Sequence, residues 1–112
     1  MLSYADNMPV VMMKGLEPRE FNKSDTKFTL QCQAWGVPPP VFTWFKDGVN
    51  LETQVTSHHL ANDITVSELK RTRISNKDDS GLYKCLASNS AGEANSSAIV
   101  SIQGIIYFTT CT

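Results

Sequence analysis

The stretch Asp79-Ser-Gly-Leu-Tyr-Lys-Cys85 decides how this chain folds. Tyr83 and Cys85 stand two positions apart, so their side chains point to the same face of an extended strand. The polar run just before it, residues 75–80, is typical of a turn or of a single helical turn. The stretch therefore predicts a polar turn followed by a strand over residues 82–88 that presents a tyrosine and a cysteine to one face.

Another strand carries a second cysteine. Within residues 27–34, Phe28, Leu30 and Cys32 share one face, and the residues between them are polar. This strict alternation is typical of a half-buried strand. A proline-rich connection follows at residues 36–40, which we expect to stay outside any strand ladder because proline lacks the backbone N–H.

The rest of the chain reads as short strands separated by turns. The next strand is predicted at residues 42–46, where Phe42 and Trp44 fall on the same face. Residues 49–60 are weakly patterned, and no segment shows sustained helical periodicity. Further strands are expected at residues 9–14, 16–21, 64–74 and 93–103, with turns at residues 22–25, 46–48 and 89–92. Short strands at this spacing predict an all-β sandwich.

These features resemble the immunoglobulin superfamily, whose pattern is Cys…Trp…Asp-x-Gly-x-Tyr-x-Cys. The residues that match it are Cys32, Trp44, Asp79, Gly81, Tyr83 and Cys85. The segments at residues 38–48 and 85–93 look like the I-set subtype, and the short cysteine separation argues against a variable-type domain. The resemblance implies an immunoglobulin-like, two-sheet antiparallel β-sandwich over residues 8–103, with a leader at 1–7 and a tail at 104–112.

The resemblance also implies roles for particular residues. Cys32 and Cys85 would form a disulfide between the sheets, and Trp44 would pack against it. Tyr83 would bond back to the backbone near the turn that holds Asp79 and Gly81. Leu30 would lie in the core. A disulfide that closes a loop of 53 residues contributes about 4 kcal/mol in the chain-entropy model.

One position departs from the family pattern. Arg71 stands where that strand of the family usually has an apolar residue, and the turn to Asp79 is one residue longer. We therefore expect a bulge or an altered register near residues 70–78.

Composition narrows the function. The 112 residues are 41% hydrophobic and 19% charged, with a net charge of −1, which is typical of one globular domain. No basic stripe predicts nucleic-acid binding, and no apolar run reaches the ~20 residues that cross a bilayer. No catalytic, cofactor or metal motif stands out, so we expect a non-enzyme without a cofactor. The first residues lack the pattern of a signal peptide.

A few residues are candidates for modification or contact. Asn22 and Asn95 begin N-glycosylation sequons. Three cysteines leave one over, so we expect Cys111 to be a free thiol in the tail or to pair with another chain. His58 and His59 are adjacent, hence on opposite faces of any strand, and are not expected to hold one metal ion together.

Two functions from different classes remain. The first is a protein-binding or adhesion module of a larger cell-surface or secreted protein, with homophilic or heterophilic protein partners. The edge of residues 10–14 is one place where another chain could add a strand. The second is an intracellular structural module of a sarcomeric or actin-associated protein, which would hold its cysteines reduced.

Overall fold

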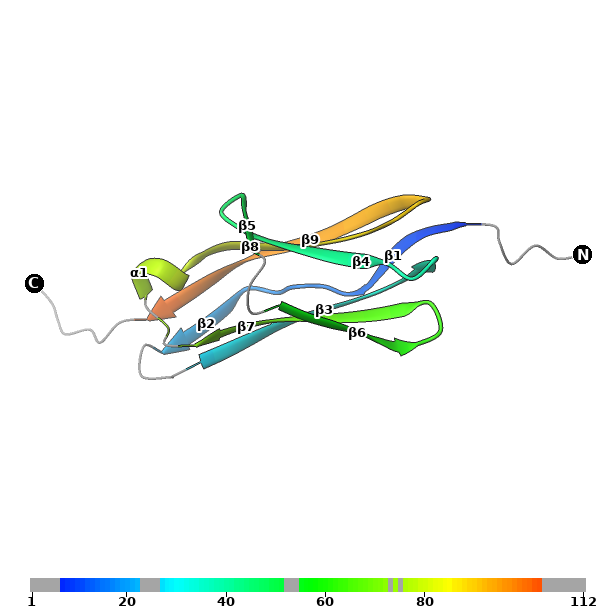
Figure 1. Cartoon of the computed structure of the whole chain (residues 1–112). Coiled ribbons are helices and arrows are strands. Elements are labelled where there is room, and N and C mark those ends of the chain that lie inside the picture. Colours follow the sequence, from blue (N-terminus) through cyan, green and yellow to red (C-terminus); the bar gives the residue numbers. More distant parts are fainter. Residues whose placement is uncertain (1–6, 23–26, 52–54, 73, 75, 104–112) are drawn as a thin grey trace, which may run out of the picture.

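The computed structural model describes residues 7–22, 27–51, 55–72, 74 and 76–103. Two sheets face each other across one core (Figure 1). The elements are β1 (Met8–Lys14), β2 (Arg19–Asn22), β3 (Lys27–Val37), β4 (Val41–Lys46), β5 (Val49–Leu51), β6 (Val55–Ala61), β7 (Ile64–Thr72), α1 (Asn76–Asp79), β8 (Gly81–Asn89) and β9 (Gly92–Gln103). The first sheet has the order β1-β3-β7-β6 and the second has the order β2-β9-β8-β4-β5.

Strand β3 forms the middle of the first sheet. Its alternate side chains from Phe28 to Ala34 are buried, which confirms the predicted inward face. The strand runs further than predicted, because Val37 still pairs with Met8 of β1. The connection outside the ladder is thus only Pro38–Pro40, which begins after a cis peptide bond between Val37 and Pro38.

The two short strands expected at residues 9–14 and 16–21 are present as β1 and β2, and they belong to different sheets. Strand β1 pairs antiparallel with β3, whereas β2 pairs parallel with β9, which no other strand pair of the described residues does. Between them the backbone N–H of Leu16 donates to the hydroxyl of Ser96, 2.8 Å away. Gly15 lies so close to Ser96 that a Cβ there would clash, and this close approach lets the chain cross from one sheet to the other.

The expected irregularity near Arg71 is absent from the described part of β7. Strand β7 pairs with β3 residue by residue from Ile64 to Thr72 without a register shift. The prediction of a bulge is therefore wrong there. Arg71 keeps its place in the alternation because Asp79 compensates its charge, as described below.

The weakly patterned segment after β4 contains two strands that the sequence does not reveal. Strand β5 pairs with β4 at one edge of the second sheet, and β6 pairs with β7 at one edge of the first. Except for the half-buried Val55, every residue of β6 is exposed. A strand exposed on both faces has no alternation of polar and apolar residues, so periodicity cannot find it.

Candidate functional site

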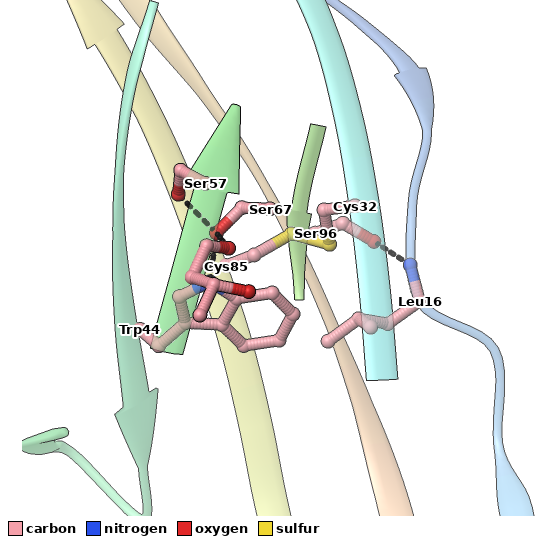
Figure 2. The surroundings of a disulfide bond; sticks show 8 residues. Leu16, Cys32, Trp44, Ser57, Ser67, Cys85 and Ser96 are labelled. Atoms are coloured by element: carbon pink, nitrogen blue, oxygen red, sulfur yellow. Dashed lines mark hydrogen bonds between the residues drawn. A yellow bond between two sulfur atoms is a disulfide. The ribbon is translucent and has the colours of Figure 1, made fainter. Parts of the chain in front are cut away.

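The centre of the sandwich is the disulfide between Cys32 and Cys85, which joins β3 to β8 (Figure 2). Their Cα atoms are 6.6 Å apart and both residues are fully buried. Trp44 of β4 is also fully buried and lies beside the bridge, and Leu30 is buried on β3. The structure thus brings the predicted cysteine pair, Trp44 and Leu30 into one core.

A serine that the sequence analysis did not single out holds the indole of Trp44. The Nε1–H of Trp44 donates to the hydroxyl of Ser67 on β7, 2.8 Å away. Ser67 is fully buried and also accepts a hydrogen bond from Ser57 of β6 at 2.7 Å (Figure 2). A buried indole N–H needs an acceptor, which was the signal that some polar residue had to face inward near Trp44.

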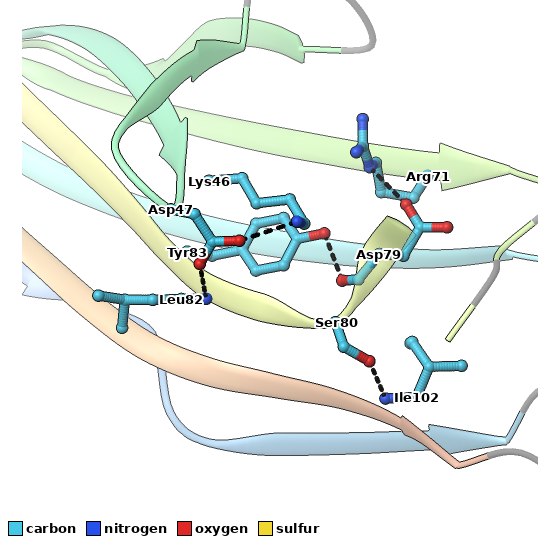
Figure 3. A network of polar contacts seen from close by, with 8 residues as sticks. All are labelled: Lys46, Asp47, Arg71, Asp79, Ser80, Leu82, Tyr83 and Ile102. Carbon is cyan, nitrogen blue, oxygen red and sulfur yellow. Dashed lines mark hydrogen bonds and ion pairs between the residues drawn. The ribbon is translucent and has the colours of Figure 1, made fainter. Parts of the chain in front are cut away.

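The turn before β8 forms a tyrosine corner. The hydroxyl of Tyr83 donates to the backbone carbonyl of Asp79 at 2.7 Å (Figure 3). The carboxylate of Asp79 in turn accepts from Nε of Arg71 at 3.1 Å. Burial of Tyr83 raises the pKa of its phenol, and the charge of Arg71 opposes that rise. These contacts link α1 to both sheets. The charges of Arg71 and Asp79 are paired with each other.

A second polar contact closes the turn between β4 and β5. The carboxylate of Asp47 accepts from the backbone N–H of Leu82 at 2.9 Å and from Nζ of Lys46 at 3.0 Å (Figure 3). The bond from Leu82, followed by that from Lys46, lowers the pKa of Asp47. A Cβ at Gly81 would lie 2.6 Å from the Asp47 carboxylate, so a side chain there would displace this carboxylate from its present place.

The outer face of the second sheet carries the sequon of β9. Asn95 is exposed and lies opposite Leu86 of β8. On the same face Nζ of Lys84 lies 4.8 Å from the centre of the Phe45 ring. Asn22 is exposed at the end of β2, next to β9. Both sequon asparagines therefore belong to the β2–β9 side of this sheet. Cys111 lies outside the described residues.

The outer face of the first sheet is partly apolar. Val11 and Met13 of β1 are 54% and 50% exposed, and Val11 lies opposite Trp35 of β3. The pairing of β1 with β3 shifts register twice, between Met8 and Val11 and again before Lys14. These shifts leave β1 an irregular edge.

A groove runs along the open side of the sandwich, between β4 and β6. We call it the β6 groove. One part has a volume of about 220 Å³ and is lined by Pro40, Val41, Phe42, Ser57, His58, His59 and Thr65. The adjoining part, of about 320 Å³, shares Phe42 with the first and is lined further by Thr43, Trp44, Asn50, Leu51 and Val55.

The two histidines take opposite sides of β6, as predicted. His59 lies opposite Thr65, whose hydroxyl is 3.4 Å from Nδ1 of His59, on the side of the groove. His58 lies opposite Val66, which places it on the outer face of β6, although the residue also borders the groove. Across the described ranges, no group of three or more His, Cys, Asp or Glu residues is placed to hold a metal ion. Nor does the described part of the chain contain a helix long and apolar enough to cross a membrane.

Comparison with known proteins agrees with this architecture. Residues 13–102 match the model of the immunoglobulin I-set domain, so the chain belongs to that family. It is 40% identical over 93 residues to the vascular endothelial growth factor receptor kdr-like of Danio rerio, covering 83% of this chain and 7% of that protein. It is 38% identical over 90 residues to human hemicentin-1, and this match covers 80% of this chain and 2% of that protein.

Solved structures show the same fold. Titin domain M7 superimposes with a TM-score of 0.71 at 27% identity, covering 88% of this chain and 97% of that one. A chain from a complex of titin M10 with obscurin-like 1 superimposes with a TM-score of 0.71 at 27% identity. The match covers 90% of this chain and 99% of that one. The chain thus corresponds to one immunoglobulin domain such as occurs repeatedly in larger multidomain proteins, and it spans only a small part of the curated relatives that it matches.

Proposed function

We propose that this chain is a non-catalytic protein-binding module of a larger extracellular protein, an adhesion molecule or a receptor. The observation that carries the proposal is the buried Cys32–Cys85 disulfide, because structural disulfides persist in oxidising compartments and are rare in the cytosol. The exposed positions of Asn22 and Asn95 support it, since a glycan needs an accessible asparagine.

The ionisable groups that the structure brings together support a non-catalytic role. Asp79 is engaged by Arg71 and Asp47 by Lys46 and the Leu82 amide. Each contact fixes a turn of the sandwich. The names of the relatives in the first comparison, a growth factor receptor and a hemicentin, fit a module that contributes contacts within a multidomain protein.

The second candidate is an intracellular structural module. It is favoured by the likeness to titin domain M7, at a TM-score of 0.71 and 27% identity. Such a module would keep Cys32 and Cys85 as thiols and would carry no glycan on Asn22 or Asn95.

Intact mass distinguishes the two. We would express the chain through a eukaryotic secretory route and alkylate it without reduction. The extracellular proposal expects that the mass of the polypeptide is lower by two hydrogen atoms, that one thiol is alkylated, and that a glycosidase removes a glycan. Asn22→Gln and Asn95→Gln variants then assign the glycan to a site. A folded protein with three alkylated thiols and no glycan would support the intracellular module instead.

A further inference from the structure

Each sheet of the sandwich ends in two edge strands whose outer backbone groups have no strand beside them among the described residues. Native proteins protect such edges with charges, prolines, bulges or very short strands. Three of the four edges follow this rule. Strand β1 has Pro9, Lys14 and two register shifts, β2 has Arg19 and Glu20 within four residues, and β5 has only three residues.

Strand β6 is the exception. It has seven residues, Val-Thr-Ser-His-His-Leu-Ala, with no proline, lysine, arginine, aspartate or glutamate. From Val55 to His59 it pairs with β7 without a shift, and the single irregularity comes only between His59 and Ala61. This regular five-residue stretch presents an unprotected row of backbone donors and acceptors.

The β6 groove lies directly beside this edge. The register places Val55, Ser57 and His59 on its side of the strand, opposite Phe42 and its neighbours of the other sheet. Among the described residues that line it, none carries a carboxylate or an ammonium group, while residues 52–54, between Leu51 and Val55, lie outside the described ranges. A strand added to β6 would direct every second side chain into this hollow, against its described, uncharged lining.

We propose that β6 and its groove bind an extended segment of a partner protein by strand addition, with small or β-branched uncharged side chains at the alternate positions that enter the groove. This inference names the surface of the protein-binding module proposed above and rests on that function. In strand addition the backbone bonds supply affinity and the alternate pockets supply selectivity. The β6 edge offers both features together.

A second copy of the chain fits less well. Seven residues of strand are about 23 Å long, so self-pairing of two β6 edges buries only a few hundred Å² per partner, against the roughly 800 Å² of a stable interface. Glycans at the two sequons would leave the groove open. Asn95 and Asn22 lie on β9 and β2, and β9 is separated from the groove strand β4 by β8.

The test uses the full chain and a capped synthetic nonapeptide of alternating threonine and valine with a lysine at each end. Backbone-amide NMR titration should shift the signals of residues 55–61, and peptide binding should slow amide exchange on β6. His59→Lys places a charge in the groove and should raise the Kd at least tenfold. Thr56→Lys adds the same charge on the outer face, opposite Glu68, and should change the Kd less than threefold.

Two further peptides test the backbone bonds. One carries N-methyl groups on every second residue and keeps the donors of one edge, and the other carries them on every residue and has lost the donors of both edges. Strand addition needs only one edge, so it expects the first to bind within threefold of the parent and the second to lose at least tenfold. Equal loss for both peptides, equal effects of the two lysine variants, or shifts that map to β1 or β5 would overturn the proposal. So would a peptide-free dimer that forms through β6 in sedimentation. None of these outcomes depends on the disulfide or glycan state that tests the compartment.

Discussion

Replacing Ser67 by alanine tests whether this hydroxyl holds the core tryptophan. Trp44 is fully buried and its Nε1–H donates to Ser67, so Ser67→Ala leaves a buried donor without its acceptor. Such a group costs about 1–3 kcal/mol. We expect the free energy of unfolding to fall by about 2 kcal/mol. With a slope of about 1.5 kcal/mol per molar urea, the unfolding midpoint falls by about 1.3 M.

Ser57→Ala is the matched control, because Ser57 also bonds to Ser67 but lies exposed on β6. Water can replace its hydroxyl, so the loss should stay below about 0.5 kcal/mol. Urea unfolding followed by tryptophan fluorescence measures both variants. The reasoning fails if Ser67→Ala lies within about 0.5 kcal/mol of the wild type, since the indole N–H would then have another acceptor.

Three further outcomes are expected. Replacing both Cys32 and Cys85 by alanine should lower the free energy of unfolding by about 4 kcal/mol in urea, and a loss below about 1 kcal/mol would contradict the loop-closure argument. Tyr83→Phe should cost about 1–2 kcal/mol. Because the pKa of Tyr83 is raised in the folded state, its stabilisation is complete below about pH 10 and is lost as the pH rises through the raised value, so unfolding curves of wild type and variant should converge at high pH. The pKa of Asp47 is lowered, so its stabilisation is present above about pH 4 and is lost as the pH falls through the lowered value. The difference in thermal unfolding between Asp47→Asn and wild type should therefore be largest near pH 7 and shrink as the pH falls below about 4, and a constant difference would contradict the assignment.

The parts of the fold that the sequence predicts are those with one buried and one exposed face. Strand β3 alternates from Phe28 to Ala34 because one side packs in the core. The same holds around Tyr83 and Cys85 on β8. Burial on one face gives a period of two, and that period is visible without any structure.

The parts that the sequence does not predict depend on contacts between distant elements. Arg71 breaks the apolar pattern, and only the fold shows Asp79 beside it, so a bulge was the natural interpretation, and it is incorrect for the described part of β7. Ser67 looks like any polar strand residue until Trp44 of the other sheet is placed opposite it. In both cases a polar side chain faces inward because one specific partner satisfies it.

Strand β6 escapes prediction for a different reason, and that reason bears on function. A strand in the middle of a sheet reveals itself by the residues that it buries, whereas six of the seven residues of β6 remain exposed. A protected edge would at least be marked by charge or proline, as β1 and β2 are. The absence of both signals leaves β6 unpatterned in the sequence, and the same absence leaves its backbone available beside the groove. The segment that is hardest to recognise from the sequence is therefore the one whose physical chemistry best suits an added strand.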